Sequence, residues 1–131
     1  MADNIKEKIE DKVIDLIVSG ALSRLVVFKP ENLTKDLIVE KRGDYKKRVI
    51  ALDIRGVESF DKGIIEKEIS QLEIENNFKA EENFYLVFVH FDAVKQEISD
   101  NFLIIPSVDL QKEKVLISKQ DFVRFLIESF A

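Results

Sequence analysis

The sequence predicts a single α/β domain over residues 1–131, in which a mixed central β-sheet is flanked by helices. Three observations predict it. Apolar residues recur at helical spacing in separate segments, β-branched and aromatic residues fill short runs between them, and no repeat or low-complexity linker divides the chain. The expected order of elements is αβββαβββα, and a chain of this length suits one hydrophobic core.

The first half of the chain predicts one helix and three strands. Apolar residues fall at every third or fourth position over 4–19, which indicates a helix that Gly20 ends. The run 23–29 is β-branched and aromatic and predicts a strand. Segments 35–40 and 48–55 alternate polar and apolar residues on either side of the turn RGDYKK, so we expect a β-hairpin there.

The second half predicts a helix, three more strands and a last helix. Apolar spacing indicates a helix over 62–76. The run FYLVFVHF at 84–91 is almost continuously apolar, which is typical of a central strand covered on both faces. A strand at 101–106 ends at a proline, and 114–118 predicts a short edge strand. Ser118 then caps the last helix.

The amino-acid composition excludes several kinds of site and of protein. The chain has no cysteine, which excludes disulfides, thiolate metal sites and a cysteine nucleophile. No apolar run approaches the roughly 20 residues that a membrane helix needs, and the charged amino terminus resembles no secretory signal. We therefore expect a soluble cytoplasmic protein without a membrane partner. The net charge of −5 argues mildly against a general nucleic-acid binder.

The charge is unevenly distributed. Residues 24–55 contain nine basic and five acidic side chains, so the net charge of this stretch is +4 and that of the remainder is −9. The basic residues gather around the hairpin turn at 41–48, where a solvated turn is the favoured interpretation. The alternative is contact with nucleic-acid phosphates. The residues that would make this contact are Lys35, Lys46, Lys47 and Arg48.

Two aspartates stand at the far ends of the hairpin strands. If the strands pair symmetrically about the turn, Ile38 faces Ala51 and Asp36 faces Asp53, with Cβ atoms about 5 Å apart. Two carboxylates that close repel unless a cation lies between them or one is protonated. Arg55, on the same face as Asp53, is one candidate cation. A divalent metal is the other, and oxygen-only ligation suits Mg²⁺ or Mn²⁺.

These segments resemble the PD-(D/E)XK nuclease superfamily, in particular its restriction-endonuclease-like and Holliday-junction-resolvase-like members. DLIVE at 36–40 is similar to the first motif strand, and IALDIRG at 50–56 lies where the family has a strand ending Glu-x-Lys or Gln-x-Lys. FYLVFVHFD followed by FLIIPS resembles the later strands, so the likeness covers roughly residues 4–106. It implies a helix, three meandering strands, a helix and a strand.

The resemblance also implies a site and a reaction, which is magnesium-dependent hydrolysis of phosphodiesters in DNA or RNA. Asp36 would be the metal-bridging acid, Asp53 the second ligand and the backbone carbonyl of Ile54 the third. Arg55 stands at the position of the catalytic lysine, and Glu10 corresponds to an acidic residue that some members contribute from the first helix. The metal would be Mg²⁺ or Mn²⁺.

Arg55 departs from the family pattern. A lysine can lose its proton, whereas a guanidinium is effectively always charged. Arg55 could clamp a phosphate in an active enzyme, or it could be a fixed counter-ion that replaces the metal. We favour the second interpretation, a catalytically silent interaction module for nucleic acid or protein, which can also act as a homodimer. An active metal-dependent endonuclease is the alternative.

Overall fold

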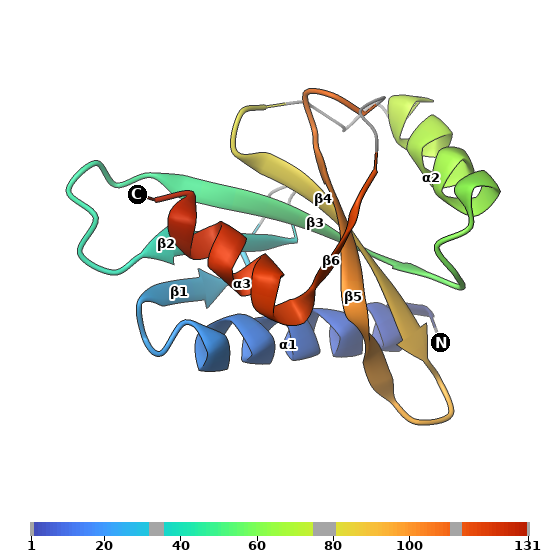
Figure 1. Ribbon diagram of the computed structural model, residues 1–131, viewed down its shortest axis with the longest axis horizontal. Coiled ribbons are helices and arrows are strands. Elements are labelled where there is room, and N and C mark those ends of the chain that lie inside the picture. The colour runs from blue at the N-terminus through green and yellow to red at the C-terminus, as the bar shows by residue number, and fades with distance from the viewer. Residues whose placement is uncertain (1, 32–35, 75–80, 111–113, 131) are drawn as a thin grey trace.

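The strands of this protein form one mixed sheet with helices on both faces (Figure 1). The computed structural model describes residues 2–31, 36–74, 81–110 and 114–130. Within them the order αβββαβββα is confirmed. The elements are α1 (Ala2–Gly20), β1 (Leu25–Phe28), β2 (Leu37–Lys41), β3 (Val49–Val57), α2 (Lys62–Ile74), β4 (Phe84–Asp92), β5 (Glu97–Pro106), β6 (Leu116–Ser118) and α3 (Lys119–Glu128).

The strand order follows the chain, β1-β2-β3-β4-β5-β6. Neighbouring strands are antiparallel except β3 and β4, which are parallel. A parallel pair needs a long crossover, and α2 lies in that connection. β4 is therefore an inner strand and β6 an edge strand, as the sequence predicted.

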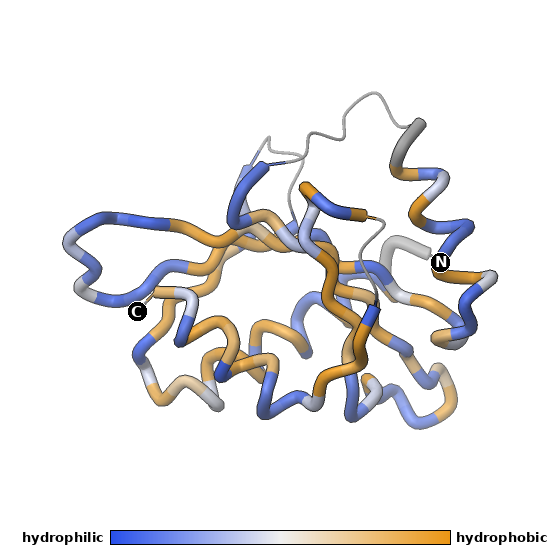
Figure 2. Tube along the Cα trace, turned by 45° about the horizontal axis from the view of Figure 1, so that its top comes forward, coloured by the Kyte–Doolittle hydropathy of each residue, from blue (hydrophilic) through white to orange (hydrophobic). Residues whose placement is uncertain are grey.

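Two hydrophobic layers cover the sheet. On one face, α1 and α3 pack against alternate residues of the strands, and Phe102 meets Phe122 edge to face with ring centroids 5.1 Å apart. On the other face α2 packs over β4 and β5 through Ile65, Ile69 and Leu72. Figure 2 shows the apolar strands between these layers and a hydrophilic loop joining β2 to β3 at one end.

The register of the β2–β3 hairpin is the one predicted from the sequence. Ile38 is paired with Ala51 and Glu40 with Val49. The ladder ends at the pair of Leu37 and Leu52, so the predicted pairing of Asp36 with Asp53 is not part of it. The backbone N–H of Asp36 donates instead to the carbonyl of Leu52 at 3.0 Å. This places Asp36 beside the Asp53 segment, at the end of the sheet where β2 begins.

Ser118 begins α3 as its N-cap, also as predicted, because its hydroxyl accepts the N–H of Asp121 at 3.1 Å. We expect Ser118→Ala to lower the free energy of unfolding by about 1 kcal/mol, because one N–H at the start of the helix loses its acceptor. Urea denaturation measures this. Ser118→Asp, which can accept the same bond, should restore most of the loss, and no difference between Ala and Asp would contradict the cap.

Candidate functional site

The predicted carboxylates gather where β3 extends beyond its pairing with β2. Leu37 is the first residue of β2 and pairs with Leu52, so Ile54 lies past the end of that ladder. The side chain of Asp36 fills this place, since its Oδ2 accepts the N–H of Ile54 at 2.7 Å. In an extended strand the N–H and C=O of one residue point to the same edge. The Ile54 carbonyl therefore faces the edge that Asp36 occupies.

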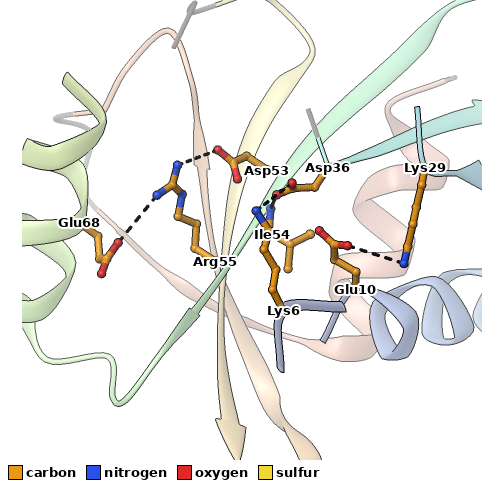
Figure 3. Close-up of polar contacts among 8 residues, drawn as sticks. All are labelled: Lys6, Glu10, Lys29, Asp36, Asp53, Ile54, Arg55 and Glu68. Carbon is orange, nitrogen blue, oxygen red and sulfur yellow. Dashed lines mark hydrogen bonds and ion pairs between the residues drawn. The ribbon is translucent and has the colours of Figure 1, made fainter. Parts of the chain in front are cut away.

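Asp53 is the buried member of the site, with 6% of its surface exposed. Its Oδ2 accepts Nη2 of Arg55 at 3.2 Å, and Nη1 of Arg55 lies 4.0 Å from Glu68 of α2. Figure 3 shows the guanidinium between these two carboxylates. Arg55 thus faces Asp53 from the side of α2.

Helix α1 supplies a second cation to the site. Nζ of Lys6 lies 3.1 Å from Oδ1 of Asp36. One helical turn later, Glu10 lies 3.7 Å from Nζ of Lys29, which also pairs with Asp11 at 2.9 Å. As Figure 3 shows, Asp36 and Asp53 therefore have different cationic partners, Lys6 on one side and Arg55 on the other.

The close approach of several acidic side chains shifts the pKa values of the site. Burial raises the pKa of Asp53 to about 7, and hydrogen bonding to Asp36 and repulsion by its charge add to the effect against the opposing influence of Arg55. Burial also raises the pKa of Glu10, together with the charge of Asp36. For Lys6 burial lowers the pKa, but attraction to Asp36 and the other acids outweighs it, so the pKa is raised. The site therefore retains protons and positive charge.

The carboxylate oxygens of the site already have protein partners in this arrangement. The Oδ atoms of Asp36 already accept the Ile54 N–H and the Lys6 ammonium, and Oδ2 of Asp53 accepts Arg55. Across residues 2–31, 36–74, 81–110 and 114–130, no group of three or more acidic or histidine side chains could hold a metal ion. The positive charge that two neighbouring carboxylates require is supplied by protein side chains.

The structure brings together five of the residues singled out in the sequence: Glu10, Asp36, Asp53, Ile54 and Arg55. Sequence reasoning missed Lys6 and Glu68. Lys6 precedes Glu10 by four residues and so shares a face of the helix, but its contact with Asp36 depends on how α1 crosses the sheet. Glu68 carries no such signal, since its role depends on how α2 packs.

The basic residues predicted to bind nucleic acid lie elsewhere, on the loop between β2 and β3. Lys46 and Lys47 are exposed there. Arg48 is half-buried, and it pairs with Asp44 at 3.1 Å and donates to the carbonyl of Phe130. Lys35 lies outside the described residues.

Comparisons with protein families, with curated proteins and with solved structures find no match. No described helix is long and apolar enough to cross a membrane. The function must therefore be inferred from the site itself.

Proposed function

We propose that this protein is a nuclease-like domain that binds nucleic acid without cleaving it, because Arg55 and Lys6 supply the positive charge that a catalytic metal would provide. The arrangement of residues 2–92 supports the comparison with restriction-endonuclease-like proteins: a helix, a three-stranded antiparallel meander, a helix and a fourth strand parallel to the third. The acidic residues lie at the end of this meander, at the positions that the resemblance implies.

The observation that carries the proposal is the direct ion pair between Arg55 and Asp53, at 3.2 Å. A metal-dependent nuclease needs carboxylate oxygens open to the metal, and a side chain in place of the lysine that can handle a proton. Here Asp53 is buried and paired with a permanently charged guanidinium. Such a pair holds the strands and helices of the site together, but it leaves no position for a metal-activated water.

The proposal of nucleic-acid binding rests on the distribution of charge. The chain carries −5 overall, so binding must be local rather than a property of the whole surface. The exposed lysines of the β2–β3 loop form such a local basic region. Their ammonium groups would contact phosphates and would not discriminate between nucleotide sequences.

The test measures binding and cleavage together, with labelled single-stranded and duplex DNA and RNA in Mg²⁺ and in EDTA. We expect binding that is unchanged by EDTA, weakens with added salt, and is followed by no cleavage. Lys46→Glu combined with Lys47→Glu should weaken binding, whereas Lys95→Glu on the exposed β4–β5 turn is the matched control. Cleavage that Asp53→Ala abolishes would overturn the proposal, as would failure to bind any of these nucleic acids.

An active Mg²⁺- or Mn²⁺-dependent phosphodiester hydrolase is the second candidate. The gathering of three acids, Glu10, Asp36 and Asp53, beside the edge that the Ile54 carbonyl faces favours it. Lys6 and Arg55 would both have to leave their present partners before a metal could bind. Metal-dependent cleavage that is lost in both Asp36→Ala and Asp53→Ala would favour this candidate.

A further inference from the structure

We infer that the loop between β2 and β3 is a contact site for single-stranded nucleic acid, in which Tyr45 stacks on a base and neighbouring lysines bind the phosphates. This inference rests on the proposed function and adds to it the form of the ligand and the residue that recognises it. We call residues 41–48 the hairpin tip. Figure 1 shows the tip projecting beyond the sheet at the end where the carboxyl terminus lies.

Tyr45 is more exposed than the other aromatic residues that the structure describes, of which Phe28 is 42% exposed. The side chain of Tyr45 is 100% exposed, on a loop that contains no other aromatic residue. The second tyrosine, Tyr85, is half-buried and packs edge to face on Phe125 with ring centroids 5.1 Å apart. A tyrosine ring that contributes nothing to the core has its full face available for a ligand.

The hairpin tip is held in a fixed shape by its own polar groups. Asp44 accepts the backbone N–H of Arg48 at 2.9 Å and also binds the Arg48 guanidinium. The same hydrogen bonds lower the pKa of Asp44 to about 2, so the contact persists throughout the neutral range. The Arg48 guanidinium also donates a hydrogen bond to the carbonyl of Phe130. A loop ordered before binding loses less conformational entropy when a ligand arrives.

The internal contacts also divide the basic residues into two groups. Arg48 and Arg42 bind protein atoms, since Nε of Arg42 donates to the carbonyl of Ser23 at 2.9 Å. Lys41, Lys46 and Lys47 are exposed, and none forms an ion pair within the part of the chain that the structure describes. Five basic residues and one acidic residue give the tip a charge of +4. The two arginines thus shape the loop, and the three lysines are available to phosphates.

A fully exposed ring beside lysines suits a single strand better than a duplex. The bases of a single strand can turn outward and stack on an aromatic face, and each such stack contributes about 1–3 kcal/mol by alanine substitution. In a duplex the bases are already stacked on each other, so only the lysines would make contact. An anionic membrane or an acidic protein would use the lysines without requiring the ring to stack. A fully exposed ring beside three lysines matches a ligand that carries both unstacked bases and phosphates, which a single strand does.

Tyrosine fluorescence can test this directly, because the chain has no tryptophan and only two tyrosines. Tyr85→Phe leaves Tyr45 as the sole emitter. Titration of this variant with oligothymidylate should quench its emission, because stacking contact with a base quenches tyrosine fluorescence. In the wild-type background, Tyr45→Ala should weaken binding of the oligonucleotide about tenfold, while Tyr45→Phe should bind nearly as the wild type does. Lys46→Glu with Lys47→Glu should reduce the slope of affinity against salt.

The outcomes separate this inference from the proposed function. Binding of oligothymidylate that is equally tight in Tyr45→Ala, or that leaves Tyr45 emission unchanged, overturns the inference, while the proposed function stands on the lysines of the loop alone. Binding of duplex DNA or anionic phospholipid vesicles that depends on Tyr45 as strongly as the single strand does also overturns it. If the wild-type protein binds no nucleic acid, both fail. Lys95→Glu remains the control for a change of charge elsewhere on the surface.

Discussion

Replacement of Arg55 by methionine should lower the free energy of unfolding by about 1–2 kcal/mol at about pH 8, because Asp53, whose pKa is about 7, must then bind a proton or stay charged without its partner. The methionine keeps much of the packing of the arginine stem but removes the charge. Asp53, which is 6% exposed, is then left beside Asp36 without its guanidinium partner. Urea denaturation at about pH 8 measures the change, because both carboxyls then tend to ionise.

A matched control shows whether the effect belongs to the buried pair. Arg124 pairs with Asp121 on an exposed face of α3 at 3.3 Å. Arg124→Met should therefore change stability by only about 0.5 kcal/mol. Addition of Asp53→Asn to Arg55→Met should recover much of the loss, since the charge that the guanidinium neutralised is gone. Equal effects of Arg55→Met and Arg124→Met would contradict the role assigned to Arg55.

The second large effect is a loss of stability as pH rises. The pKa of Asp53 is raised from 3.8 to about 7 in the folded protein, so between these values the folded state holds a proton that the unfolded state has released. This proton stabilises the fold fully at low pH, and its contribution is lost as pH rises towards 7. Each pKa unit corresponds to about 1.4 kcal/mol, so the loss from this group is on the order of 4 kcal/mol.

Asp53→Asn isolates that contribution, because an amide stays neutral and can still donate to Asp36. The charged neighbours of this position are unchanged in the variant: Asp36 and Arg55 beside it and Lys6 from α1. The variant should become more stable than the wild type as pH rises from about 5 to about 8. Asp100→Asn, whose side chain is 96% exposed, should follow the wild-type curve. Parallel curves for Asp53→Asn and the wild type would contradict the raised pKa.

Much of the fold could be predicted because it depends on local patterns. The alternation of 35–40 and 48–55 around a turn fixed which residues face each other, and the pairing of Ile38 with Ala51 followed from it. β5 is longer than predicted, since it begins at Glu97 rather than 101. Residues 97–101 contain only one large apolar residue, Ile98, so pairing with the end of β4 rather than hydrophobicity makes them a strand.

The partners within the site could not be predicted in the same way. The sequence indicated that Asp36 and Asp53 need a positive neighbour and offered Arg55 or a metal, but the Lys6 contact joins residues 30 positions apart. It depends on how α1 crosses the sheet, for which one sequence gives no local signal. Arg48 shows the converse case: its pairing with Asp44, four residues earlier, was within reach of local reasoning. Tyr45 lies in the turn that the sequence predicted to be solvated, but its residue type alone does not indicate a ligand.

Isothermal titration of the wild-type protein with Mg²⁺ tests most directly whether side-chain cations take the place of a metal. If Lys6 and Arg55 occupy the carboxylates as described, the titration should show no saturable heat, and Asp53→Asn should give the same trace as the wild type. Stoichiometric binding of Mg²⁺ by the wild type that disappears in Asp53→Asn would contradict the account and restore the metal-dependent hydrolase.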